Sequence, residues 1–137
     1  RLIKQEKVKP YFKKSLYSSE LIEVKVEDGT TVPVTIVYKR SSRSTVARPM
    51  LLSGYGAYGI PSDPYFSTPR LSLLDRGVIF AVAHVRGGGE SGRAWHDKGR
   101  MLLKRNSFND FISCAKEKTR CASANQWHLD PNGSCGT

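Results

Sequence analysis

Apolar and polar positions alternate early in the chain, and later give way to short runs that are wholly apolar. Residues 22–26 and 32–38 place Ile, Val or Tyr at every second position. They are separated by Asp28-Gly29, a dipeptide typical of tight hairpin turns. A period of two therefore predicts an antiparallel pair of strands with one buried face. Pro33 has no amide proton, so we expect its amide side to lie at an edge or a bulge.

Two later segments predict strands that are covered on both faces. Residues 50–54 and 78–83 are short and almost free of polar side chains, as in parallel sheets with helices on both sides. Between them, Thr68 can serve as an N-cap, with Pro69 at the first helical position and Gly77 as the stop. Strand, helix and strand predict a right-handed βαβ unit. The fold class is therefore α/β.

Further helices are expected toward the end of the chain. Residues 90–98 are predicted to form a short helix, and Asn106 or Ser107 can cap a longer one with apolar positions at helical spacing. The period fails after Thr119. Residues 120–137 contain no sustained pattern, so we expect an irregular tail.

Composition excludes some classes of function and favours others only weakly. The formal charge is +10, but the basic residues are dispersed and do not interleave with aromatic ones, so nucleic-acid binding is not favoured. No apolar run is long enough for a membrane helix. Three late cysteines without a C-x-x-C pair predict neither a disulfide framework nor a zinc site, and they favour a reducing, cytoplasmic setting.

The glycine loops invite a nucleotide-binding interpretation, which the spacing does not support. The pattern G-x-G-x-x-G occurs at residues 54–59 and again at 87–92. Pro61 prevents a helix from starting directly after the first copy. The second copy lacks the acidic residue at the end of a following strand, because Asp110 falls in a helical pattern. We therefore expect turns and close packing here, with no cofactor and no metal.

No catalytic triad can be assembled from the sequence. The nearest approach to the nucleophile elbow G-x-S-x-G is residues 89–93, and it fails at Arg93. The three histidines, His84, His96 and His128, stand alone, and we interpret them as structural.

Tyr55 and Tyr58 are the candidate site residues. Both lie in the glycine loop that follows a predicted strand, where open α/β sheets bind ligands. A tyrosine hydroxyl can donate to an oxyanion, and a tyrosine ring can line a substrate pocket. Packing of the rings beneath the loop is an equally open alternative.

Four segments together resemble the prolyl oligopeptidase family of serine peptidases, and most of all its oligopeptidase B branch. The similarity covers about residues 17 to 119, and the motifs that carry it are residues 54–59, 70–77, 84–90 and 106–110. The resemblance implies part of an α/β-hydrolase fold, in which an antiparallel hairpin precedes a parallel βαβ unit and the sheet is incomplete. It also implies three regions: a linker at 1–18 that leaves a β-propeller, a partial peptidase domain at 19–119, and a tail at 120–137 that departs from the family.

The resemblance also implies an activity and roles for single residues. The family hydrolyses short peptides through a Ser-Asp-His triad, after Lys or Arg in the oligopeptidase B branch. Tyr55 matches the tyrosine that completes the oxyanion hole, Tyr58 matches an aromatic position at the substrate pocket, and residues 86–90 match a supporting loop. The triad is absent from these 137 residues. We therefore expect a truncated fragment that is inactive alone, is marginally stable and tends to associate through its open sheet edge.

Two alternatives to a peptidase fragment stay open. One is a non-catalytic interaction protein that binds a full-length relative, and the other is a weak basic nucleic-acid binder.

Overall fold

The computed structural model describes residues 3, 12–42 and 48–123, with the backbone alone at residues 42 and 118–123. Most of the predicted linker and residues 124–137 of the predicted tail lie outside this part. The strands are β1 (Tyr17–Lys25), β2 (Thr31–Lys39), β3 (Met50–Ser53) and β4 (Ile79–Ala83). The α-helices are α1 (Thr68–Asp75), α2 (Arg93–Asp97) and α3 (Arg105–Ser123), and short 3₁₀ turns occur at η1 (Lys14–Leu16), η2 (Arg40–Ser42) and η3 (Met101–Leu103). No helix in the described residues is long and apolar enough to cross a membrane.

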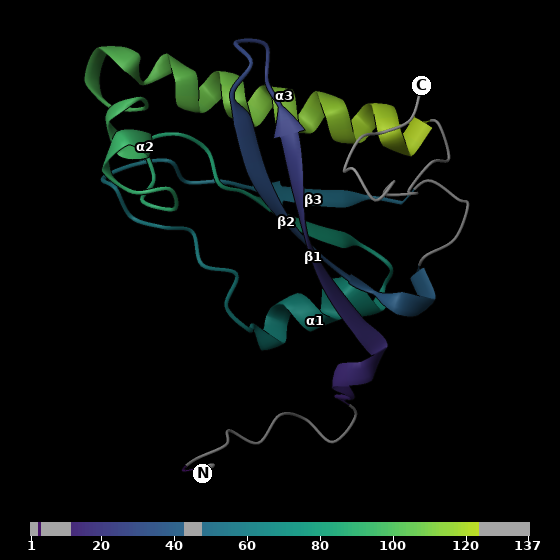
Figure 1. The fold of residues 1–137 in the computed structure, drawn as a ribbon. Helices are drawn as coiled ribbons and strands as arrows, with labels where there is room; N and C mark the ends of the chain where they lie inside the picture. The colour runs from purple at the N-terminus through teal and green to yellow at the C-terminus, as the bar shows by residue number, and fades with distance from the viewer. Residues whose placement is uncertain (1–2, 4–11, 43–47, 124–137) are drawn as a thin grey trace.

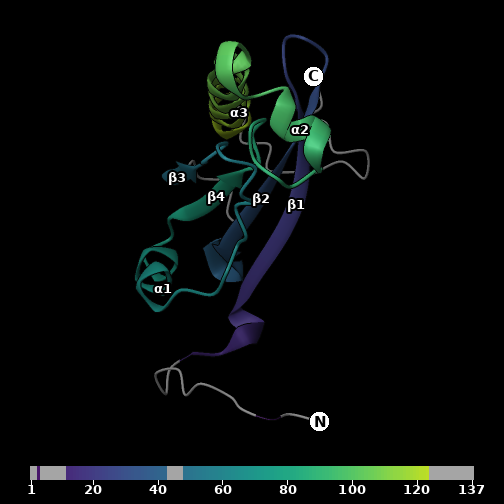
Figure 2. The same cartoon turned by 90° about the vertical axis from the view of Figure 1, so that its left-hand side faces the viewer.

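The strands form one mixed sheet in the order β1-β2-β4-β3 (Figures 1 and 2). β1 pairs with β2 and β2 with β4 in antiparallel fashion, whereas β3 and β4 are parallel. The predicted hairpin and the predicted strand–helix–strand unit are therefore both present. Gly29 has a φ of 82° in the hairpin turn, a conformation that glycine adopts without strain.

Helices cover the sheet on opposite faces (Figures 1 and 2). On one face, the alternating residues of the hairpin pack with Cys114 and Phe111 of α3. On the other face, Leu74 and Leu71 of α1 pack against Phe80 and Val82 of β4. All five residues of β4 are buried, because this strand lies between neighbours and under both helices.

Pro33 lies in an interior strand, and its missing amide proton is compensated by a side chain. His84 donates its amide to the Pro33 carbonyl at 2.9 Å, directly beyond the last Cα pair of the β2–β4 ladder. The reciprocal bond to the His84 carbonyl cannot form, because proline has no N–H. The indole Nε1 of Trp95 donates to that carbonyl at 3.2 Å instead. The expectation of an edge or bulge is thus corrected: the proline sits where the ladder ends, and Trp95 satisfies the unpaired acceptor.

β3 differs from the prediction because it is not covered on both faces. It is the last strand of the sheet in the described residues, and its side chains alternate between half-buried and exposed. Leu51 is 47% exposed. The physical reason is that α1 packs on β4 and β2, and no described strand pairs with the outer side of β3.

Helix ends differ from the predicted ones by a few residues. Ser67, not Thr68, is the N-cap of α1, while Gly77 ends this helix with a φ of 84° as predicted. α3 begins at Arg105, so neither Asn106 nor Ser107 caps it. It continues to Ser123, into the region predicted as irregular, because residues 120–123 include no glycine or proline that would stop a helix.

Candidate functional site

The two glycine loops lie against each other, backbone to backbone. Gly59 donates its amide to the Gly87 carbonyl at 3.1 Å. A β-carbon on Gly87 would meet the Gly56 carbonyl oxygen at 2.2 Å, and one on Gly89 would meet the Gly59 carbonyl oxygen at 2.2 Å. Side chains at these positions would therefore force the loops apart. The glycines serve close packing, as the sequence analysis expected, and each loop fixes the path of the other.

Replacing Gly87 with alanine is expected to destabilise the protein by about 3 kcal/mol, since overpacking against backbone adds to the strain of a left-handed conformation. Gly87 has a φ of 97°. Gly29→Ala is the matched control, because Gly29 has a φ of 82° and nothing lies within 4 Å of its added β-carbon. Its expected loss is about 1 kcal/mol. Urea unfolding followed by fluorescence measures both, and equal losses would contradict the steric argument.

Tyr55 and Tyr58 both reach the surface of the first glycine loop. Tyr55 lies two residues after the carboxyl end of β3 and is 54% exposed. Tyr58 is 83% exposed and has a φ of 54°, a left-handed conformation that is uncommon for a residue other than glycine. Such conformations persist where the surrounding structure holds them, often at functional sites. The rings are thus not packed beneath the loop, and their catalytic and binding roles stay predictions.

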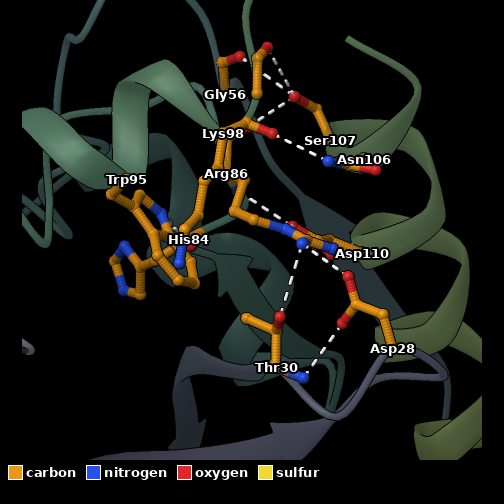
Figure 3. Close-up of polar contacts among 11 residues, drawn as sticks. Asp28, Thr30, Gly56, His84, Arg86, Trp95, Lys98, Asn106, Ser107 and Asp110 are labelled. Carbon is orange, nitrogen blue, oxygen red and sulfur yellow. Dashed lines mark hydrogen bonds and ion pairs between the residues drawn. The ribbon is translucent and has the colours of Figure 1, made fainter. Parts of the chain in front are cut away.

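Beneath the second loop, Arg86 forms a buried ionic network (Figure 3). Its guanidinium donates to Asp110 from Nε at 2.9 Å and from Nη2 at 2.5 Å, and its amide donates to the same carboxylate at 3.0 Å. Nη1 donates to Asp28 at 2.6 Å and to the Thr30 hydroxyl at 3.3 Å. The Arg86 side chain is 5% exposed and that of Asp110 is fully buried. One residue therefore ties the hairpin turn, the loop and α3 together.

The charges of this network are stabilised by their hydrogen bonds. The hydrogen bonds that Arg86 donates to Asp110 raise the pKa of Arg86 above its usual range; burial opposes this shift, and the bond to Asp28 adds to it. Hydrogen bonds from Thr30, followed by the one from Arg86, lower the pKa of Asp28 from 3.8 to about 2. Both groups therefore stay charged at neutral pH, and the contacts are structural.

A second polar cluster anchors the far end of the first loop. His84 Nε2 lies 2.8 Å from the Thr35 hydroxyl, and its Nδ1 lies 3.6 Å from Glu90 Oε1. That carboxylate oxygen also accepts the Ser62 amide at 2.9 Å. Burial raises the pKa of Glu90, but the nearby His84 ring and the hydrogen bond from the Ser62 amide outweigh burial and lower it overall. Glu90 thereby holds the loop as an anion.

The described residues contain no assembled hydrolytic triad. No hydrogen bond joins a histidine to a serine among them, and no cluster of three His, Cys, Asp or Glu could hold a metal ion there. His96 Nδ1 lies 2.9 Å from the Gly87 carbonyl, so it must carry the proton and donate. His84 and His96 both have structural partners, in keeping with the sequence interpretation, and His128 lies outside the described part.

Asp110 is a functional residue of the fold that the sequence shows only as an acidic position in a helical pattern. Ser107, Asp110 and Cys114 recur at helical spacing and are all buried, so Asp110 lies on the inner face of α3. A charged residue on the apolar face of an amphipathic helix requires a buried partner. This requirement could have pointed to Asp110 from the sequence alone. Its candidate partner was Arg86, which directly precedes three glycines.

Comparison with known proteins agrees with this arrangement. The sequence profile of the prolyl oligopeptidase family matches residues 64–126. Dipeptidyl aminopeptidase BI of Pseudoxanthomonas mexicana is 47% identical over 113 residues, which are 82% of this chain and 16% of that protein. Oligopeptidase B from Trypanosoma brucei, solved in a closed form with covalently bound antipain, is 41% identical with a TM-score of 0.85, covering 89% of this chain and 17% of that one. The chain belongs to the prolyl oligopeptidase family.

Membership in the family defines the fold more closely. The matched solved structures carry an α/β-hydrolase catalytic domain, and the small mixed sheet described here is consistent with part of that fold. Protease 2 of Moraxella lacunata, 43% identical over 77% of this chain, is matched over only 15% of its length. The chain therefore spans about one sixth of the length of the prolyl oligopeptidase relatives that it matches.

Proposed function

We propose that this chain is part of the catalytic domain of a serine oligopeptidase that hydrolyses short peptides after Lys or Arg. Its two glycine loops would lie beside the oxyanion that forms during the reaction. One observation carries the proposal. In a chain of this family, Tyr55 is 54% exposed at the carboxyl end of a parallel strand, on a loop whose path is fixed by residues 87–89. Ligands bind at this end of open α/β sheets.

The chemistry follows from the position of the phenol. When a serine attacks a peptide carbonyl, negative charge develops on the carbonyl oxygen. A hydroxyl that is already held in place can donate to that oxygen, and it stabilises the transition state more than the substrate. Tyr55 is assigned this role. The exposed ring of Tyr58 is assigned to contact the substrate.

The remaining catalytic groups would have to come from other residues. Residues 1–137 contain no G-x-S-x-G segment, so this chain offers no nucleophile elbow. Alone, it is expected to hydrolyse nothing. Pairing of a partner, or of a second copy, with the outer edge of β3 stays a prediction.

The experiment is a chimera in which residues 17–119 replace the matching segment of the Trypanosoma brucei oligopeptidase B. We expect the chimera to cleave a fluorogenic peptide after Arg or Lys, and a serine-reactive phosphonate to abolish the cleavage. The 137-residue chain alone should show no cleavage. A folded chimera without activity, or phosphonate-sensitive turnover by the chain alone, would contradict the proposal.

A further inference from the structure

Lys104, which directly precedes α3, contacts the loop that bears Tyr55. Its ammonium Nζ donates to the carbonyl of Gly56, the residue directly after Tyr55, and lies 3.4 Å from the Ser107 hydroxyl. It also lies 5.9 Å from the centroid of the Phe108 ring. A charged side chain thus reaches the backbone next to the candidate oxyanion donor.

The Gly56 carbonyl depends on this lysine for its hydrogen bond. The Ser107 hydroxyl lies within hydrogen-bond reach of three carbonyls, those of Arg86, Gly99 and Gly56 (Figure 3). A hydroxyl has only one proton, and the Gly56 oxygen is the farthest of the three, at 3.5 Å. An ammonium group can donate three hydrogen bonds and accepts no hydrogen bond. Lys104 can therefore donate to Gly56 and also to Ser107, which leaves the serine proton for Arg86.

The charge on Lys104 has no carboxylate partner in the part of the chain that the structure describes. Gly56 itself is buried and has a φ of 60°. A β-carbon on Gly87 would meet the Gly56 carbonyl oxygen at 2.2 Å, so the second glycine loop lies directly against this carbonyl. A charge-assisted hydrogen bond to a buried carbonyl is stronger than a neutral one. It fixes the orientation of the Gly56–Ala57 peptide group, one residue beyond Tyr55.

We propose that Lys104 is a positioning residue for the Tyr55 hydroxyl. It acts through the Gly56 carbonyl, and it sets the direction in which the Tyr55 phenol leaves the loop. This inference rests on the proposed function of Tyr55, but it concerns a different side chain. A purely structural lysine would stabilise the fold without any effect that passes through Tyr55.

The first test uses the complete 137-residue chain with fluorine-labelled tyrosine. Lys104→Gln should shift the fluorine resonance of Tyr55 and the amide nitrogen resonance of Ala57, which shares its peptide group with the Gly56 carbonyl. Lys104→Arg, which keeps charge and donors, should restore both. Lys98→Gln is the matched control, because Lys98 is exposed. Unchanged Tyr55 and Ala57 resonances in Lys104→Gln would overturn the inference.

The second test measures kinetics in the chimera. Lys104→Gln should lower kcat about 10-fold and leave KM unchanged. A small displacement of the Tyr55 hydroxyl from its reactive position is expected to have an effect of this size. In a Tyr55→Phe background the same substitution should have no further effect on kcat. An equal loss in both backgrounds would assign Lys104 a structural role and overturn the inference. If Tyr55→Phe itself leaves kcat unchanged, the proposed function fails instead.

Discussion

Replacing Asp110 with alanine is expected to lower the free energy of unfolding by about 3–5 kcal/mol, the usual effect of breaking a buried ion pair. Asp110 is fully buried and accepts three hydrogen bonds from Arg86. Its removal leaves the guanidinium, which is 5% exposed, with only the partly exposed Asp28 and Thr30. A loss of this size is a large share of the stability of any small domain. Urea unfolding of the chain, monitored by fluorescence, measures it.

Two variants separate burial from charge in this prediction. Asp97 also pairs with arginine, at 3.1 Å to Arg93 and 2.8 Å to Arg100, but its side chain is 41% exposed. Asp97→Ala should therefore lower stability by less than about 1 kcal/mol. Asp110→Asn keeps the shape and one acceptor, so its effect should be intermediate. If Asp110→Ala destabilises no more than Asp97→Ala, the network does not hold the loop to α3 and the hairpin.

The parts of the fold that the sequence predicts are those governed by local patterns. Alternation at residues 22–26 and 32–38 depends only on one buried face, so the hairpin follows directly. Gly77 ends α1 because a left-handed residue is needed there. The apolar run at 78–83 forms a strand whose residues 79–83 are buried on both faces. In each case a single residue type or period decides the outcome without knowledge of distant contacts.

The parts that escaped prediction depend on contacts between distant segments. The bond from Trp95 to the His84 carbonyl follows from the register that places His84 opposite Pro33. The role of Asp110 depends on a guanidinium 24 residues away in the chain. The exposure of Leu51 depends on which strand lies beside β3. Periodicity reports whether a face is buried, but not what buries it.

The sequence suggests which residues form the candidate site, but not the contacts that hold them in place. Tyr55 and Tyr58 are predicted from their place in a glycine loop after a strand; both are exposed there, and their roles stay predictions. Lys104 was not found, since a lysine before a helix usually lies in solvent. Its contact with Gly56 exists only because η3 brings the start of α3 next to the first loop. Loop-to-helix contacts of this kind have no signal in a single sequence.

Replacing Tyr55 with phenylalanine in the active chimera is expected to lower kcat by about 10²–10³-fold, the typical loss when one oxyanion donor is removed. The substitution deletes only the hydroxyl. Because Tyr55 is 54% exposed and no hydrogen bond to its hydroxyl occurs among the described residues, stability should not change. KM should also stay the same, since the bond forms in the transition state. Steady-state kinetics with a fluorogenic Arg or Lys peptide measure both constants.

The control for this prediction is Tyr65→Phe, which removes a hydroxyl from the same connection between β3 and α1. Tyr65 is 69% exposed and its ring is approached by the Arg70 guanidinium at 5.2 Å, a contact that phenylalanine keeps. Its kcat should equal that of the parent chimera. Equal fractional losses in kcat and kcat/KM for Tyr55→Phe identify an interaction made only in the transition state. A rise in KM at constant kcat would instead make Tyr55 a ground-state contact to the substrate, and the oxyanion role would have to be given up.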